Sequence, residues 1–129
     1  MQAGIELDSI IAERVFGDKF EYQQRFKGYY RPWKQDPIAF EPCPKYSTDI
    51  KEAWKVVEQL LRILPNEDVH MEHWNDGESS GWQVSTCFEL GEWKGWVEAE
   101  TLPHAICLAA LKVFKVSDYG KRGVFQNRF

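Results

Sequence analysis

The stretch that decides the fold is Tyr46–Leu64, YSTDIKEAWKVVEQLLRIL, whose start, apolar face and end can all be identified from the residues alone. Its apolar residues recur at steps of three and four, which places them along one stripe of an amphipathic helix. These residues are Ile50, Ala53, Trp54, Val57, Leu60, Leu61 and Leu64. We expect the stripe to be buried and Trp54 to contribute most, so that Trp54→Ala costs roughly 3–5 kcal/mol.

Both ends of this helix carry residues that helix termini favour. Ser47, Thr48 and Asp49 have side-chain oxygens that can accept hydrogen bonds from the free N–H groups of a first turn, and Asp49 with Glu52 is typical of a capping box. Pro65 follows the last apolar position and stops the helix.

A second helix is predicted before this stretch and a third after it. The apolar positions between Gly4 and Val15 have helical spacing, and Gly17 is suited to end that helix. Near the other end of the chain, Thr101 and Pro103 open a helix whose run AICLAALKVF, residues 105–114, is apolar on nearly every side. A helix of that kind is buried on more than one face.

Between the second and third helices the pattern changes to the period of strands. Val69–Trp74 and Trp82–Leu90 alternate, a turn at Asn75–Gly77 joins them, and Trp93–Thr101 alternates again. In the last strand, Trp93, Val97 and Ala99 are expected on one face and Trp96 and Glu98 on the other. Three strands with short turns predict an antiparallel meander.

The segment Asp18–Lys45 has no sustained period and contains many aromatic residues and prolines. We expect a long functional loop there, in which FEYQQRF at Phe20–Phe26 could form a short strand. The order of elements predicts an α+β fold, an α-β-α layered sandwich with an antiparallel meander, forming one domain over residues 1–129. The predicted core comprises Leu7, Ile10, Trp54, Val57, Leu61, Val84, Phe88, Ile106 and Ala110.

Charge is distributed unevenly along the chain, although the net charge is only −4. Asn66–Glu100 contains nine acidic residues and a single base, Lys94. The aromatic insert at residues 18–45 and the tail at residues 117–129 are basic, so an anionic ligand would be drawn to those segments. The overall acidity argues against long nucleic acid as a partner.

Cysteine and hydropathy patterns favour a cytosolic protein. The three cysteines are far apart and form no C-x-x-C pair, which indicates reduced thiols rather than a disulfide framework or a zinc site. No apolar run approaches the roughly 18 residues of a membrane span, and the N-terminus lacks the features of a signal peptide. We therefore expect no membrane association.

Three segments of the chain resemble a known family. They are ELDSIIAERVFG at Glu6–Gly17, YSTDIKEAWKVVEQL at Tyr46–Leu60 and AETLPHAICLAALK at Ala99–Lys112. These segments are similar to the phage ABA sandwich domain family, small phage-encoded proteins with an α-β-α layer order. The resemblance implies a phage origin and expression in the cytoplasm of the infected bacterial host. It implies no particular activity.

No catalytic or metal-binding motif is recognised in the sequence. His70-Met71-Glu72-His73 looks like a ligand cluster, but on a strand His70 and Glu72 share one face and His73 points to the other. Two ligands on one face make a poor zinc site, so the histidines are interpreted as structural or solvated. We expect no cofactor, no metal and no catalysis.

Several residues instead indicate ligand binding. Aromatic rings interleave with cations in Gly28–Lys34, a combination that stacks a base while neutralising a phosphate. Helix N-termini present free N–H groups to anions, although their caps more often serve only the helix. The candidate binding residues are Tyr29, Tyr30, Arg31, Trp33, Lys34, Ser47, Thr48, Lys121 and Arg122.

These features lead to one functional hypothesis and two alternatives. The hypothesis is a homo-oligomeric phage protein that binds a small anionic nucleotide and counters host defence by sequestering a nucleotide immune signal. The first alternative is a protein-interaction module or inhibitor whose acidic Asn66–Glu100 face meets a basic host protein. The second is an enzyme that processes a nucleotide.

Overall fold

The structure, a computed structural model, describes residues 1–33, 36–64 and 69–120. Within these ranges the helices are α1 (Ile5–Phe16), α2 (Ile50–Ile63) and α3 (Leu102–Gly120). The strands are β1 (Glu21–Gln23), β2 (Gly28–Trp33), β3 (Asp36–Pro42), β4 (His70–Asn75), β5 (Ser80–Ser85), β6 (Cys87–Glu89), β7 (Glu92–Lys94) and β8 (Val97–Ala99). The α+β class and the antiparallel meander predicted from the sequence are confirmed.

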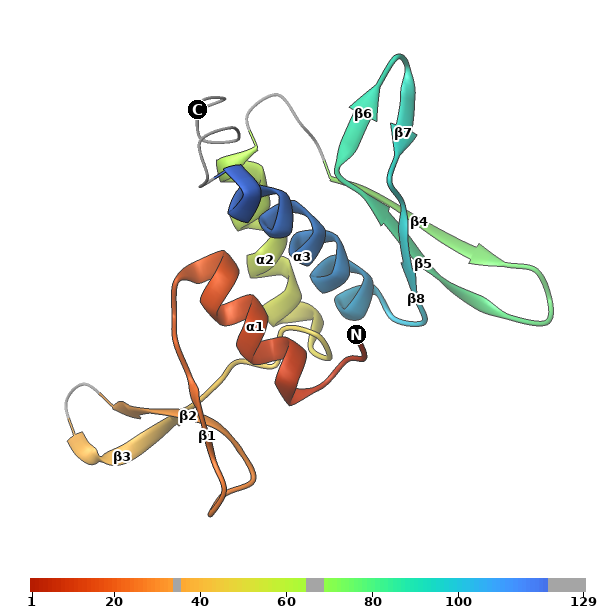
Figure 1. The fold of residues 1–129 in the computed structure, drawn as a ribbon. Coiled ribbons are helices and arrows are strands. Elements are labelled where there is room, and N and C mark those ends of the chain that lie inside the picture. Colours follow the sequence, from red (N-terminus) through yellow and green to blue (C-terminus); the bar gives the residue numbers. More distant parts are fainter. Residues whose placement is uncertain (34–35, 65–68, 121–129) are drawn as a thin grey trace.

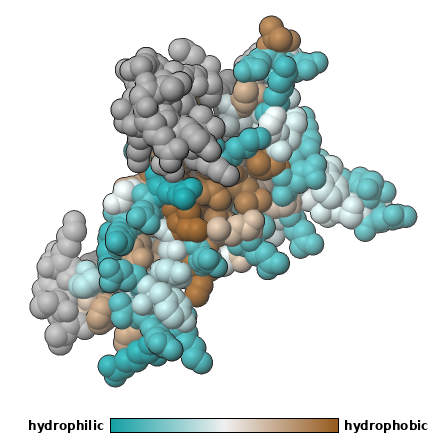
Figure 2. Space-filling model, viewed as in Figure 1, coloured by the Kyte–Doolittle hydropathy of each residue, from teal (hydrophilic) through white to brown (hydrophobic). Residues whose placement is uncertain are grey.

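The helices lie together in the middle of the molecule, with a sheet on either side (Figure 1). The sheet β4-β5-β8 packs on α3, and the sheet β1-β2-β3 lies beside α1. Helix α3 contacts α1, α2, β5 and β8, which explains why its sequence is apolar on nearly every side. Its residues Ala105, Ile106, Cys107 and Ala110 are completely buried. On the face shown in Figure 2, apolar surface gathers over the helices, and the outlying hairpins are mostly polar.

The helix boundaries follow the signals in the sequence. Helix α1 ends at Gly17, which has φ +70° and donates its N–H back to Glu13. Helix α2 begins after Asp49, whose carboxylate accepts the N–H of Lys51 at 2.9 Å. The predicted capping box is not formed, because the side chain of Glu52 pairs with Lys55 at 3.1 Å and the N–H of Asp49 donates to the carbonyl of Lys45 at 2.9 Å. Asp49 is therefore the N-cap of α2, as the sequence predicted.

Two residues of the predicted core are not buried. Trp54 is 49% exposed and Leu61 is 48% exposed, together with Ile50 on the same side of α2. The reason is that α2 packs mainly on α3 and touches α1 at few residues, so only one side of its wide apolar stripe is covered. Val56, absent from the predicted stripe, is fully buried instead. The expectation of a large energetic contribution from Trp54 is thus wrong.

Most of the remaining predicted core is confirmed. Leu7, Val57, Val84, Ile106 and Ala110 are buried, and Ile10 is half-buried. The side chain of Phe88 lies outside the part that the structure describes.

The segment predicted as a long loop folds into a sheet of its own. Antiparallel pairing joins β1 to β2 and β2 to β3, and β1 falls within the stretch FEYQQRF. Alternation is hard to see in this segment because its aromatic residues lie on both faces of a small sheet, where Tyr22 contacts Tyr29 and Phe26 contacts Tyr30.

The last two predicted strands are each broken in the structure. The stretch expected as Trp82–Leu90 divides into β5 and β6 around Thr86, and the stretch Trp93–Thr101 divides into β7 and β8. Gly95, with φ +68°, interrupts the alternation of the second stretch. Trp93 therefore does not share a face with Val97 as predicted, but lies with Trp96 against His70.

Candidate functional site

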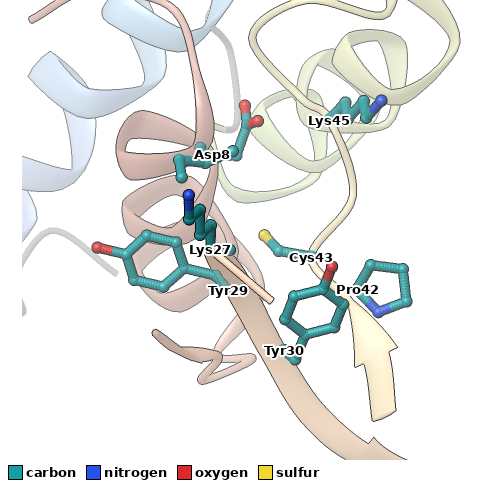
Figure 3. A pocket seen from close by; sticks show the side chains of 9 residues that line it. Asp8, Lys27, Tyr29, Tyr30, Pro42, Cys43 and Lys45 are labelled. Atoms are coloured by element: carbon teal, nitrogen blue, oxygen red, sulfur yellow. The ribbon is translucent and has the colours of Figure 1, made fainter. Parts of the chain in front are cut away.

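A pocket of about 140 Å³ opens where α1, β2 and the segment after β3 meet (Figure 3). Residues from distant parts of the chain line this pocket because β2 contacts α1. Its lining comprises Ile5, Asp8, Lys27, Gly28, Tyr29, Tyr30, Pro42, Cys43 and Lys45. Two lysines, two tyrosines and one buried carboxyl group thus share a small space.

Asp8 connects the pocket to the start of α2. Only 3% of Asp8 is exposed, and its Oδ1 atom accepts the N–H of Ser47 at 2.7 Å and the hydroxyl of Ser47 at 2.6 Å. The Ser47 hydroxyl also accepts the N–H of Gly4 at 2.9 Å. Burial raises the pKa of Asp8, and the hydrogen bonds from Ser47 and the charge of Lys45 oppose that rise.

The two tyrosines do not face one another. Tyr29 and Tyr30 are consecutive on β2, so their side chains lie on opposite faces of the strand, as Figure 3 shows. The ring of Tyr29 makes an edge contact with Tyr22, 5.4 Å between centroids, and the ring of Tyr30 contacts Phe26 at 5.5 Å. A single base cannot be sandwiched between this pair, although each ring offers a separate stacking face.

Arg31, predicted to hold a phosphate, is paired within its own sheet. Its Nε atom lies 2.6 Å from the Glu41 carboxylate and one terminal nitrogen lies 3.1 Å from Asp18. Its guanidinium also lies 4.7 Å from the centroid of the Phe20 ring. The hydrogen bond to Glu41 is the main cause that raises the pKa of Arg31. The guanidinium of Arg31 is therefore engaged in contacts that stabilise the sheet, rather than held ready for a phosphate.

The remaining predicted residues lie apart or outside the described range. Ser47 is fully buried and its hydroxyl is used by Asp8 and Gly4, whereas Thr48 is exposed at the surface. Both precede the N-cap of α2. Lys34, Lys121 and Arg122 fall outside the described residues, as does the side chain of Trp33. The structure thus brings Tyr29 and Tyr30 to one pocket, with Ser47 directly behind Asp8.

Sequence reasoning missed Asp8, Lys27 and Lys45 as pocket residues. Asp8 lies near the start of the first predicted helix, where an acidic residue is favourable for the helix alone, and both lysines lie outside the aromatic segment Gly28–Lys34. A carboxylate on the apolar side of an amphipathic helix, next to Leu7 and Ile11, was the available signal.

Cys43 lines the same pocket but is unsuited to nucleophilic chemistry. The pKa of its thiol is raised to about 12, mainly by burial and to a smaller extent by the nearby carboxylate of Asp8. Since the thiolate is the nucleophile, Cys43 is almost entirely protonated at neutral pH.

Strand β4 places its two histidines on opposite faces, as its alternation predicted. His70 Nε2 lies 3.2 Å from Glu72 on one face of β4, and His73 packs on Trp82 on the other. Within residues 1–33, 36–64 and 69–120, no three His, Cys, Asp or Glu side chains gather closely enough to hold a metal ion. None of the helices in these ranges is long and apolar enough to cross a bilayer.

Comparison with known proteins gives one match. No curated protein and no solved structure matches the chain. The family model of the phage ABA sandwich domain matches residues 9–111, which include most of α1, all of α2, the described strands and the first half of α3. The α+β fold is consistent with that sandwich. This chain therefore belongs to the phage ABA sandwich domain family.

Proposed function

We propose that this phage protein acts in the cytoplasm of the infected bacterium by binding a small anionic nucleotide, without catalysis, and so counters a host defence that depends on such a signal. The observation that carries the proposal is the joint presence of Lys27, Lys45 and the two tyrosines around one pocket. A nucleotide needs a planar surface for its base and cations for its phosphate.

The size of the pocket limits what enters it. At about 140 Å³ it is smaller than the roughly 300–1,000 Å³ of pockets that enclose drug-sized ligands. One base or one phosphate-bearing end of the ligand fits inside, and the rest lies outside over the surface next to Lys27. Both lysines are exposed, so they can reach phosphate oxygens there.

Asp8 is compatible with an anionic ligand for an electrostatic reason. Only 3% of Asp8 is exposed, and the positive charge of Lys45 is close enough to oppose the rise in the Asp8 pKa that burial causes. Ser47 donates two hydrogen bonds to one of its oxygens, which offsets its negative charge locally.

A subunit contact through α2 is part of the proposal. The sequence suggested a homo-oligomer because α3 is apolar all round, but the neighbours of α3 already cover several of its faces. An uncovered apolar surface lies instead on the outer stripe of α2, formed by Ile50, Trp54 and Leu61, each about half exposed. An isologous contact between two copies of this stripe would bury it.

Ligand binding is tested by thermal shift. The protein is screened against cyclic di- and trinucleotides and ADP-ribose-derived signals, and bound ligand is recovered after heating. We expect at least one nucleotide to raise the melting temperature of the wild type and of R62A, which removes an exposed cation from the last turn of α2, at the opposite end of that helix from Ser47. The shift should be smaller in K45A, since a charge-assisted hydrogen bond contributes roughly 1.5–3 kcal/mol.

Three outcomes would contradict this proposal in different ways. If no nucleotide shifts the melting temperature, the sequestration hypothesis is wrong. If the recovered ligand is chemically altered, the protein is an enzyme. If a pull-down from host lysate yields one stoichiometric protein and no small molecule, the interaction-module alternative is correct.

A further inference from the structure

The outer face of the sheet β4-β5-β8 combines carboxylates with aromatic rings. Strand register places Glu72, Gln83 and Glu98 side by side in one row across the three strands. The opposite face carries Met71, Val84 and Val97, which pack on the hydrophobic core. Glu72 and Glu98 are both exposed, whereas Val84 is completely buried. The row of polar side chains therefore faces solvent.

Aromatic residues lie on both sides of this row, because His70 and Trp74 flank Glu72 on the same face of β4. On one side the ring of His70 stacks on Trp93, with centroids 4.9 Å apart, and makes an edge contact with Trp96 at 5.5 Å. On the other side Trp74 lies over Gly81, where a Cβ atom would come within 2.9 Å of the indole. The indole faces that remain accessible offer surfaces to a cation.

The carboxylate of Glu72 is held in place by its neighbours. Glu72 contacts His70 Nε2 at 3.2 Å through one oxygen and accepts the Gln83 amide N–H at 2.8 Å through the other. Among the described residues, Glu98 has no ion-pair partner in the sheet. One fixed and one unpaired carboxylate thus lie two strand spacings apart, roughly 10 Å.

The charge around this face determines whether it attracts a positively or a negatively charged partner. From residue 69 to residue 100 there are seven acidic residues and one base, Lys94. Such a field attracts cations and repels anions, nucleotides included. Between the two basic side chains, Arg fits better than Lys because its guanidinium is planar, stacks on aromatic rings and pairs with a carboxylate through two parallel hydrogen bonds.

We propose that this face, formed by Glu72, Gln83, Glu98, His70, Trp93 and Trp96, is a docking surface for an arginine-bearing segment of a partner protein. The roughly 10 Å separation of the two carboxylates matches two arginines three residues apart in a segment with polyproline II conformation, where residues i and i+3 lie on the same side about 9 Å apart. This site is distant in sequence from the pocket beside α1 and does not depend on a nucleotide.

The test uses a fluorescently labelled hexa-arginine peptide and fluorescence anisotropy at low ionic strength. We expect E72Q/E98Q to weaken binding about tenfold, the combined effect of losing two surface ion pairs. The matched control is E13Q/E58Q, which removes the same charge from exposed positions on α1 and α2. Melting temperatures of both double variants check that the fold is intact.

Aromatic stacking is tested separately. Trp96→Leu should weaken binding severalfold, and Trp96→Phe should restore part of it, because a phenyl ring keeps the cation–π contact. A hexa-citrulline peptide, which is neutral but similar in shape, should not bind.

The proposal is overturned if E13Q/E58Q weakens binding as much as E72Q/E98Q, since the effect would then reflect net charge alone. Equal binding of hexa-lysine and hexa-arginine would remove the role assigned to the guanidinium plane. Binding of a neutral glucose oligosaccharide in place of the peptide would identify the face as a carbohydrate site instead.

Discussion

The carboxylate of Asp8 on α1 accepts both the backbone N–H and the side-chain hydroxyl of Ser47, at 2.7 and 2.6 Å. This pair joins two segments 39 residues apart in sequence at the back of the pocket. Both residues are buried, so the hydrogen bonds are shielded from water and are stronger than they would be at the surface.

Ser47→Ala should destabilise the protein by roughly 1–3 kcal/mol, because it leaves the N–H of Gly4 without its acceptor and removes one hydrogen bond from a buried carboxylate. The measurement is urea denaturation followed by circular dichroism. Thr48→Ala, next to it but exposed, serves as the control and should change the free energy of unfolding by less than about 0.5 kcal/mol. Equal effects would show that the network does not stabilise the fold.

The raised pKa of Asp8 gives a pH dependence with a definite sign. Because the pKa is higher in the folded protein than in the unfolded chain, the folded state binds more protons, and stability falls as pH rises above the ordinary value of about 4. Asp8→Asn does not titrate. The wild type should therefore lose stability relative to Asp8→Asn between about pH 4 and the raised pKa, then run parallel to it. Parallel curves from pH 3 to 8 would contradict the shift.

The exposed outer stripe of α2 predicts that two copies of the protein associate through it. A charge introduced into the stripe should prevent this association. Leu61→Glu places a carboxylate on a residue that is 48% exposed, so the fold should tolerate it while an apolar contact between copies should not. Sedimentation equilibrium should show the wild type as a dimer and Leu61→Glu as a monomer. The control, Lys55→Glu, alters an exposed position of the same helix and should remain dimeric. A monomeric wild type at micromolar concentration would rule out the contact.

Gly81 is required by the packing of the outer sheet face. A Cβ atom at this position would lie 2.8 Å from the carbonyl oxygen of Ala99 and 2.9 Å from the Trp74 ring. Because the first clash is with backbone, Gly81→Ala should cost roughly 1–3 kcal/mol, as overpacking does. Thermal denaturation should show a lower melting temperature for Gly81→Ala than for the wild type. An unchanged melting temperature would mean that the strands separate without cost.

Leu90 at the β6–β7 turn is a position where stability can be gained. It has φ +52°, a left-handed conformation that leucine disfavours, and it is 93% exposed. Asn tolerates this left-handed conformation. An Asn followed by Gly91 would form the Asn-Gly pair that two-residue hairpin turns favour. Leu90→Asn should raise the free energy of unfolding by about 0.5–1 kcal/mol, measured by urea denaturation. A loss of stability would show that the leucine contacts something in the folded protein.

Local signals in the sequence determined the parts of the fold that depend on neighbouring residues. The positive φ of Gly17 ends α1, the carboxylate of Asp49 caps α2, and Asn75 accepts the N–H of Gly77 in the β4–β5 turn. The alternation of β4 by itself places His70 and His73 on opposite faces, without any tertiary contact. Each of these features is set by interactions within a few residues, which a sequence pattern records directly.

Only the tertiary structure decided which apolar side chains are covered and which polar side chains have a partner within the protein. The sequence marks Trp54 and Leu61 as apolar but does not show that α3 covers one side of α2 and leaves the other open. Likewise it cannot show that Asp8 binds Ser47, or that Arg31 binds Glu41. These partners are 39 and 10 residues apart, and long-range packing, which brings such groups together, has no signature in local spacing.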